Sequence, residues 1–123
     1  MGVRSYRDLI AWQKGMDLVE GVYRATRDWP REELHGLTSQ IRRAAVSIPA
    51  NVAEGHARSG AREYLHHLSI AYGSLREVET HLLIAERLRY VDAALSQVLL
   101  GQAAEVARIL LGLMRSLRAS APP

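Results

Sequence analysis

The sequence predicts an all-α protein, an antiparallel up-down-up-down four-helix bundle that forms a single domain over residues 1–123. Three observations predict this fold. Apolar residues recur at three- and four-residue steps in every long segment, the links between these segments are short, and aliphatic residues dominate a chain that has no Phe. Helices joined by short links pair antiparallel with their neighbours in sequence, and the length suits one hydrophobic core.

The first two helices are predicted at about residues 5–27 and 36–58. In the first, the apolar stripe is Leu9, Trp12, Met16, Val19, Tyr23 and Thr26, and Trp29-Pro30 ends the helix. The acidic Glu32 and Glu33 favour the start of the second helix, whose apolar stripe is Leu37, Ile41, Ala44, Ile48 and Val52. Pro49 removes a backbone hydrogen bond there, so we expect a kink in this helix.

The last two helices are predicted at about residues 60–88 and 92–119. The third begins after Ser59-Gly60, and its apolar stripe is Tyr64, Leu68, Ala71, Leu75, Val78, Leu82 and Ala85. The fourth follows Asp92, a plausible cap, and ends at Ala121-Pro122-Pro123; its stripe is Leu95, Leu99, Val106, Ile109, Leu113 and Leu117. A second apolar edge predicts burial between subunits, and it consists of Leu65, Tyr72, Leu83, Leu100, Ala103, Leu110 and Met114.

A polar stripe lies beside the apolar stripe of the second helix. Its members are Gln40, Arg43, Ser47, Asn51 and Glu54. Amides, a hydroxyl and a single Arg favour specific hydrogen bonds over simple solvation. Two destinations are open for this stripe: a hydrogen-bonded layer among the helices, or a surface that meets the next subunit. Either way, we interpret it as a device for assembly and specificity.

Composition excludes several classes of protein. The chain has no cysteine, so disulfides, zinc-thiolate sites and thiol catalysis are excluded. No apolar segment follows a basic N-terminus, and no uncharged apolar run reaches the length of a membrane span, so we expect a soluble, cytoplasmic protein. The formal net charge is +3, and Lys14 is the only lysine among 16 basic residues. Arginine suits phosphate recognition, but it also suits ion pairs at interfaces.

The sequence offers no complete catalytic or metal site. Glu63 and His66 have the spacing of a metal-binding pair, but the other helices lack the matching ligands of a di-metal centre. His67 and His81 are two heptads apart, too far to share a metal or a proton within one chain. Ser47 has no histidine among its neighbours at helical spacing, and no glycine-rich phosphate loop exists. We therefore expect a protein that is not an enzyme and that binds no cofactor or metal.

Arginine patches are the candidate sites for nucleic acid. They fall near the predicted helix ends and comprise Arg42, Arg58, Arg62, Arg87, Arg89, Arg115 and Arg118. Bonds from these residues to phosphates would hold RNA or DNA without reading bases. Glutamates interspersed among these arginines reduce the positive potential of the patches. The aromatic residues that could stack on bases, Trp12, Tyr23, Tyr64 and Tyr72, are predicted to lie on apolar stripes and to be buried in the core.

The chain resembles a bacterial family of small four-helix proteins named for open reading frames inside intervening sequences of 23S ribosomal RNA. The resemblance covers nearly the whole chain and is strongest from Pro30 to Glu79. It rests on Tyr6-x-x-Leu9-x-x-Trp12, Tyr23-x-x-Thr26, Trp29-Pro30, Glu33, Gly36-Leu37-x-x-Gln40-Ile41-x-Arg43-Ala44-x-x-Ser47-Ile48-Pro49-x-Asn51-Val52-Ala53-Glu54-Gly55, Arg58, Glu63-Tyr64, Ala71-x-Gly73-Ser74-Leu75-x-Glu77 and Glu79.

The resemblance implies a four-helix bundle that assembles into a homopentameric ring. Similar subunits serve diversity-generating retroelements as basic pentamers that bind nucleic acid, and the present chain differs from them in its milder net charge. Two functions therefore stay open. The chain is expected to be a homopentameric adaptor that binds RNA or other nucleic acid, or an oligomeric scaffold for protein interactions without such a ligand.

Overall fold

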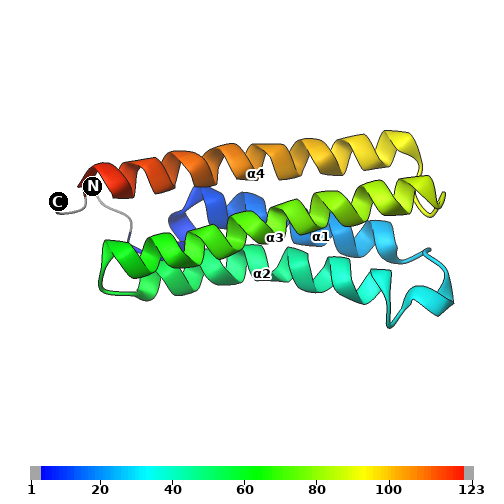
Figure 1. The fold of residues 1–123 in the computed structure, drawn as a ribbon, viewed down its shortest axis with the longest axis horizontal. Coiled ribbons are helices and arrows are strands. Elements are labelled where there is room, and N and C mark those ends of the chain that lie inside the picture. The colour runs from blue at the N-terminus through cyan, green and yellow to red at the C-terminus, as the bar shows by residue number, and fades with distance from the viewer. Residues whose placement is uncertain (1–3, 121–123) are drawn as a thin grey trace.

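The computed structural model describes residues 4–120, which form four long α-helices and two short 3-10 helices. The long helices are α1 (Ile10–Thr26), α2 (Leu37–Ala57), α3 (Ala61–Arg87) and α4 (Ala93–Ser120). The 3-10 helices are η1 (Tyr6–Asp8), before α1, and η2 (Arg31–Glu33), before α2. Successive long helices run in opposite directions along one axis (Figure 1), which confirms the predicted all-α, up-down-up-down four-helix bundle.

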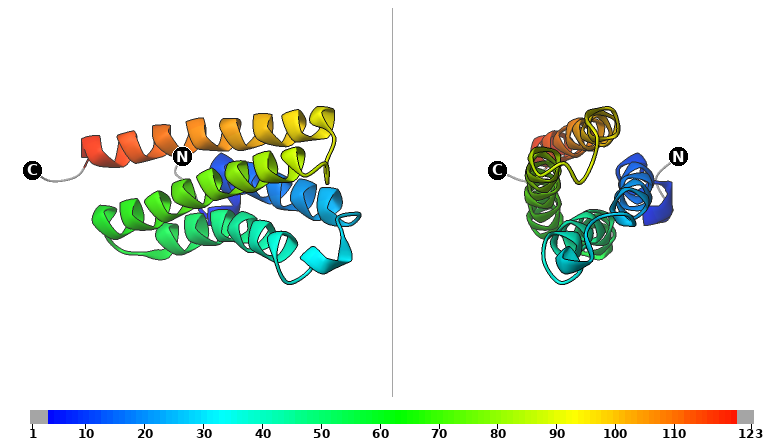
Figure 2. Two further views of the ribbon diagram at one scale, coloured as in Figure 1. Left: turned by 45° about the vertical axis from the view of Figure 1, so that its right-hand side comes forward. Right: turned by 90° about the vertical axis from the view of Figure 1, so that its right-hand side faces the viewer.

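The four helices are arranged as a square when viewed along the bundle (Figure 2). Each helix packs against its two neighbours around the square, and across its diagonals the described residues make no such contact. Two ends of the bundle matter below. The α2–α3 end contains the link between α2 and α3 and the C-terminal end of α4. The α3–α4 end contains the link between α3 and α4, together with η2 before the start of α2.

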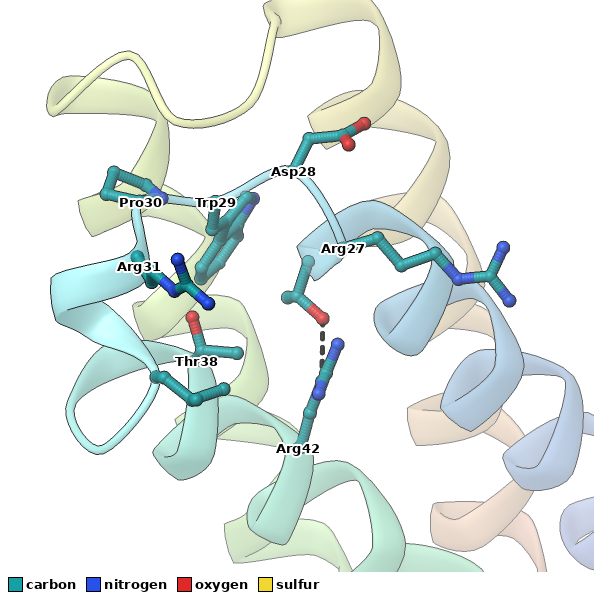
Figure 3. Close-up of a pocket in the computed structure, with 9 residues that line it drawn as sticks. Arg27, Asp28, Trp29, Pro30, Arg31, Thr38 and Arg42 are labelled. Atoms are coloured by element: carbon teal, nitrogen blue, oxygen red, sulfur yellow. Dashed lines mark hydrogen bonds between the residues drawn. The ribbon is translucent and has the colours of Figure 1, made fainter.

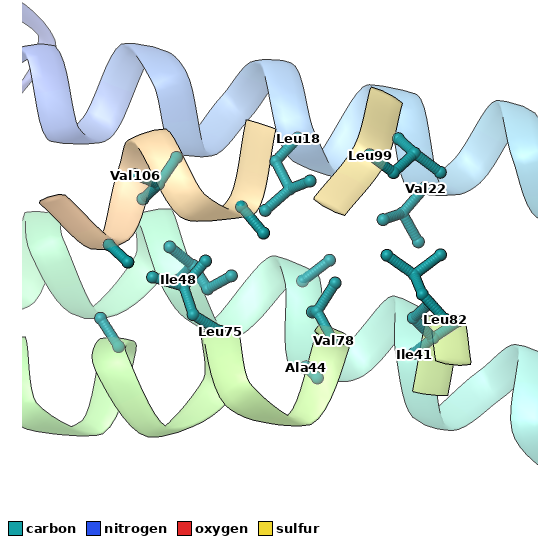
Figure 4. Packing of buried hydrophobic residues seen from close by; sticks show 14 of the residues in the cluster. Leu18, Val22, Ile41, Ala44, Ile48, Leu75, Val78, Leu82, Leu99 and Val106 are labelled. Atoms are coloured by element: carbon teal, nitrogen blue, oxygen red, sulfur yellow. The ribbon is translucent and has the colours of Figure 1, made fainter. Parts of the chain in front are cut away.

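The core occupies the centre of this square and is aliphatic. Leu18, Ile48, Leu75 and Val106 come from the four different helices, each is at most 1% exposed, and their side chains converge between the ribbons (Figure 4). The predicted stripes of α2 and α3 are confirmed, since all their members are buried except Leu37 and Tyr64, which are partly buried. Pro49 lies inside α2, and the helix continues past it to Ala57.

The predicted start of the first helix is wrong, and its predicted apolar stripe is confirmed only in part, because Thr26 is buried and Leu9, Trp12 and Val19 are partly buried against the core. Ser5 caps the separate helix η1, and Leu9 is extended, with φ −73° and ψ 127°, so α1 begins only at Ile10. Its buried residues are Ala11, Gly15, Leu18, Val22 and Thr26. Met16 and Tyr23 are instead 44% and 40% exposed. The side of α1 that faces α2 includes the small Gly15, where an added Cβ would lie 3.5 Å from side-chain atoms of Ile48 and Pro49, an ordinary contact distance.

The stripe of the fourth helix and the second apolar edge also require correction. In α4, Ala103, Leu110 and Met114, which the sequence assigns to the second edge, are buried in the core, whereas Leu95 is 39% exposed. Leu65, Tyr72 and Leu100 are partly buried against the core, and only Leu83, at 50%, is well exposed. This edge is therefore mostly covered within the subunit, where α3 packs against α4.

The α3–α4 connection is fixed by backbone and side-chain hydrogen bonds. The N–H groups of Arg89 and Tyr90 donate to the carbonyls of Glu86 and Ala85, respectively, and Arg89 has a positive φ of 63°. The Tyr90 hydroxyl donates to Glu33 Oε2 at 2.9 Å, while Glu33 Oε1 accepts from the Leu37 N–H at 3.1 Å. Glu33 therefore joins the start of α2 to this connection, which confirms that it favours the helix N-terminus.

One described helix, α4, is long and apolar enough to span a membrane by length and composition alone. The core helix of a water-soluble bundle passes the same test. In α4 the apolar run is interrupted by Glu105, which forms an ion pair with Lys14 of α1 at 3.2 Å, and by the exposed Arg108. The predicted stop at Ala121-Pro122-Pro123 lies outside the described residues.

Candidate assembly and nucleic-acid surfaces

A layer of hydrogen bonds joins α2 to α3 midway along the bundle. Asn51 Nδ2 donates to the carbonyl and the hydroxyl of Ser47 at 2.9 and 3.0 Å. The hydroxyl of Ser74, on α3, donates to Ser47 Oγ at 3.0 Å, and His67 Nδ1 lies 3.0 Å from Asn51 Oδ1. Because the amide oxygen of Asn51 faces the ring, this geometry assigns a proton to Nδ1 of His67.

His81 extends the polar side of α3 beyond this layer, two heptads from His67. It is 9% exposed, and within residues 4–120 its Nδ1 has no hydrogen-bond partner. Burial lowers the pKa of His81 below its ordinary value, and the nearby Glu77 carboxylate partly offsets that effect. His67 and His81, which the sequence predicts on one face, lie on the same side of α3 as Ser74, whose hydroxyl is bonded to Ser47 of α2.

The polar stripe of α2 divides into an inner and an outer part. Ser47 and Asn51 are partly buried and take part in the layer between the helices. Gln40, Arg43 and Glu54 are exposed, and no side-chain hydrogen bond involves them among the described residues. Of the two destinations left open by the sequence, the first therefore applies to Ser47 and Asn51, while the outer three residues remain available to a partner.

Four of the predicted arginines gather at the α2–α3 end. Arg58 caps the C-terminus of α2, Arg62 lies in the first turn of α3, and Arg115 and Arg118 lie in the last turns of α4. All four are exposed, and no ion pair within residues 4–120 involves them. The nearest acidic positions along α2 and α3 are Glu54 and Glu63, so basic residues outnumber carboxylates here.

The other three predicted arginines lie elsewhere. Arg87 and Arg89 are exposed at the α3–α4 end, beside Glu86 and Asp92 in sequence. Arg42 is engaged within the bundle: its Nε donates to Thr26 Oγ1 at 2.8 Å, and its guanidinium lies 4.5 Å from the ring centroid of Tyr23. The seven arginines therefore do not form one surface.

Two apolar faces lie on opposite sides of the bundle. The α1–α2 face comprises Trp12, Met16, Val19 and Tyr23 of α1 and Val46, Ala50 and Ala53 of α2. Met16, Tyr23 and Val46 on it are each at least 40% exposed. The α3–α4 face comprises Leu65, Tyr72, Leu83, Leu100, Ala104 and Leu111, of which Leu83 and Leu111 are 50% and 39% exposed. The other well-exposed apolar residues are spread over the remaining surface: Ile10, Leu34, Ile70, Ile84, Leu88, Leu95 and Val98.

The α1–α2 face differs in part from the sequence prediction that its aromatic residues are buried in the core. Trp12 and Val19 are partly buried against the core, as predicted, but Tyr23 is 40% exposed and lies outside it. The stripe is adjacent to α2, because the ring of Tyr23 stacks on Arg42 and Gly15 packs against Pro49. The part of the predicted second edge that stays well exposed, Leu83 of α3, thus has a counterpart in Met16, Tyr23 and Val46 on α1 and α2.

A pocket of about 520 Å³ opens beside the link between α1 and α2. Its lining comprises Thr26, Arg27, Asp28, Trp29, Pro30, Arg31, Leu34, Thr38 and Arg42 (Figure 3). Sequence reasoning missed this pocket because its residues come from the end of α1, the link, η2 and the start of α2. The only signal in the sequence is the density of arginine around Trp29-Pro30.

The residues weighed for catalysis or metal binding lie as follows. Glu63 and His66 are both exposed near the start of α3. No three His, Asp or Glu side chains of residues 4–120 lie close enough to one another to bind a metal ion. Ser47 does have a histidine nearby, which helical spacing within α2 alone could not show, but Asn51 stands between Ser47 and His67 in the hydrogen-bond layer. A serine nucleophile needs the base in direct contact.

Comparison with known proteins shows one matching family and a similar solved structure. A family described as 23S rRNA-intervening sequence protein matches residues 7–112. The chain is also similar to a crystal structure of a protein of unknown function from the S23 ribosomal protein family of Bacteroides thetaiotaomicron VPI-5482. The TM-score is 0.77 at 18% sequence identity, and the match covers 85% of this chain and 98% of that one. No curated protein matches the sequence.

Proposed function

The chain belongs to the 23S rRNA-intervening sequence protein family, and we propose that it is a non-enzymatic, homo-oligomeric adaptor that binds RNA or other nucleic acid through its α2–α3 end. The observation behind the proposal is the clustering of Arg58, Arg62, Arg115 and Arg118 at that end. We further propose that the adaptor is a pentamer, on the basis of the family resemblance, and that it acts in the cytoplasm.

Two opposite apolar faces support assembly into a ring. A ring forms when one surface of a subunit meets a different surface of the next subunit and the rotation closes. The α1–α2 face and the α3–α4 face provide two such surfaces on opposite sides of the square (Figure 2). In the proposed ring, Met16 and Val46 of one subunit pack against Leu83 and Leu111 of the next.

The outer part of the polar stripe supports the same interface. Arg43 is three residues before Val46, and Glu54 is four residues after Ala50, so both flank the α1–α2 face on the surface of α2. Interfaces commonly surround an apolar centre with a polar rim. We assign Gln40, Arg43 and Glu54 to that rim, where they select the orientation of the neighbouring subunit.

Assembly into a ring multiplies the positive charge at the α2–α3 end. In a closed cyclic ring, every subunit presents the same end at the same level, so four arginines at one end become a repeated basic surface. Each isolated cluster is diluted by Glu54 and Glu63, but several copies would engage successive phosphates of one strand at once. Arginine donates two parallel hydrogen bonds to a phosphate, which suits binding that does not read sequence.

The test is a titration of a structured RNA hairpin across a salt series. The wild-type protein is compared with the double variant Arg115→Gln, Arg118→Gln and with a matched control, Arg87→Gln, Arg89→Gln, which removes the same charge at the opposite end. We expect the first variant to bind more weakly and to lower the salt slope by about 0.7 to 0.9 for each phosphate that the protein no longer neutralises. The control should behave as wild type.

Two results would count against this function. Equal weakening in both double variants would show that net charge, not the α2–α3 end, governs binding. Absence of binding by the wild type at low salt would reject the nucleic-acid ligand and favour the alternative, an oligomeric scaffold for protein interactions. The oligomeric state is measured separately, so failure of RNA binding leaves the assembly proposal to its own test.

A further inference from the structure

The pocket beside the α1–α2 link gathers hydrogen-bond donors with little to neutralise them. In Figure 3, the guanidinium group of Arg31 lies beside the hydroxyl of Thr38, the guanidinium group of Arg42 lies across from them at its bond to Thr26, and Arg27 and Asp28 extend away. These donors come from η2 and from the first turns of α2, so the pocket exists only in the folded chain.

No carboxylate balances these two guanidinium groups in the described structure. The ion pairs within residues 4–120 involve Lys14, Arg24 and Arg76, and neither Arg31 nor Arg42 takes part in one. Arg42 uses Nε for Thr26 and one terminal nitrogen for the Tyr23 carbonyl, which leaves further N–H groups free. Two unbalanced guanidinium groups in one concave site favour a bound anion.

Trp29, Pro30 and Leu34 supply the apolar part of the lining. Trp29 is only 6% exposed and forms one wall, with Pro30 and Leu34 beside it. Its buried indole Nε1 has no hydrogen-bond partner among the described residues. A volume of about 520 Å³ lies within the range of roughly 300 to 1,000 Å³ that is common for small-molecule sites.

We propose that this pocket binds a phosphate monoester attached to a small planar group, with Arg31 and Arg42 holding the phosphate, Thr38 donating its hydroxyl, and Trp29 contacting the planar group. A free mononucleotide and the 5′-phosphorylated end of a strand share this chemistry. The site is distinct from the α2–α3 end, because Arg31 and Thr38 lie at the opposite end of the bundle.

Tryptophan fluorescence provides a direct readout. The chain has two tryptophans, so in a Trp12→Phe background Trp29 is the only tryptophan, and excitation at the red edge of the absorption band avoids the tyrosines. Inorganic phosphate is titrated against potassium chloride at matched ionic strength. We expect a saturable change with phosphate only, weakened at least about tenfold in Arg31→Gln, because a charge-assisted bond is removed. The control Arg87→Gln removes an exposed arginine near the same end, one that forms no ion pair within residues 4–120, and should bind phosphate as the background does.

A second series distinguishes the sources of the phosphate. Uridine 5′-monophosphate should bind more tightly than inorganic phosphate, and uridine should not bind. An oligonucleotide with a 5′-phosphate is then compared with its 5′-hydroxyl form; tighter binding of the phosphorylated strand than of the mononucleotide identifies a strand end, and the reverse order identifies the free nucleotide.

The proposal is overturned by any of three results. These are no saturable phosphate binding below about 10 mM, equal weakening in Arg31→Gln and Arg87→Gln, or equal affinity for uridine and its monophosphate. The Arg115→Gln, Arg118→Gln variant should retain phosphate binding, so failure of this site and failure of RNA binding at the α2–α3 end can be told apart.

Discussion

At the scale of single residues, the polar stripe of α2 contains side chains with different tasks. Asn51 bridges Ser47 and His67, so its amide satisfies polar groups on two helices. Arg43 lies four positions from Ser47 on the same helix, yet its guanidinium is exposed. The sequence could show that these residues share a stripe. One stripe can extend from buried to exposed surface, however, and only the structure shows which part of it α3 covers.

Asn51→Ala is therefore expected to destabilise the chain by about 1 to 3 kcal/mol, because it removes the bonds to Ser47 and leaves the partly buried Nδ1 of His67 without its partner. Arg43→Ala should change the free energy of unfolding by no more than about 0.5 kcal/mol. Urea denaturation of both variants measures this difference. Similar destabilisation in both would show that the outer stripe also stabilises the subunit itself; a reduced oligomer mass in folded Arg43→Ala would support its place in the rim of the interface.

His81 makes stability depend on pH. Its pKa is lowered by burial, so the unfolded chain takes up a proton at a higher pH than the folded chain does. The stability that neutral His81 permits is present above its unfolded-state pKa of about 6.5 and is lost as pH falls through the lower folded-state value. Melting temperatures between about pH 7.5 and pH 5 should fall less in His81→Leu than in wild type. Parallel curves would contradict this assignment.

At the scale of helices, the sequence predicted α2 and α3 well and α1 and α4 less well. In α2 and α3 large aliphatic residues occupy the buried side, so the stripe is visible in the sequence. In α1 the buried side includes Ala11 and Gly15, and larger residues such as Met16 face outward. In α4 apolar residues lie on most sides of the helix, so the apolar periodicity is compatible with two different buried stripes. Only the packing of α4 against α1 and α3 determines which of them is buried.

Close approach of α2 and α3 gives a test at this scale. A Cβ at Gly55 would lie 2.9 Å from His67 Cβ and from Tyr64 Cδ1, whereas Gly73, inside α3, has no atom within 4 Å of such a Cβ. We expect Gly55→Ala to destabilise the fold by about 1 to 3 kcal/mol. Gly73→Ala should stabilise it by about 0.5 to 1 kcal/mol, because alanine favours helix. Thermal unfolding compares the two, and a neutral Gly55→Ala would contradict the packing described.

At the scale of the whole molecule, surface chemistry varies around and along the bundle. The apolar α1–α2 and α3–α4 faces lie on opposite sides, and the six predicted arginines outside the pocket divide between the two ends. The sequence predicted the arginine clusters, because they are local. It could not predict which clusters share an end or that Arg31 and Arg42 line one pocket, since those juxtapositions depend on four chain segments meeting in the fold.

Assembly through the two apolar faces underlies the proposed function, and the mass of the wild-type protein in solution tests it most directly. Multi-angle light scattering at micromolar concentration should give five times the 13.7 kDa of one chain. Val46→Glu, which places a charge at the centre of the α1–α2 face, should lower that mass while the helical circular dichroism is retained. A wild-type mass of one chain would contradict the account.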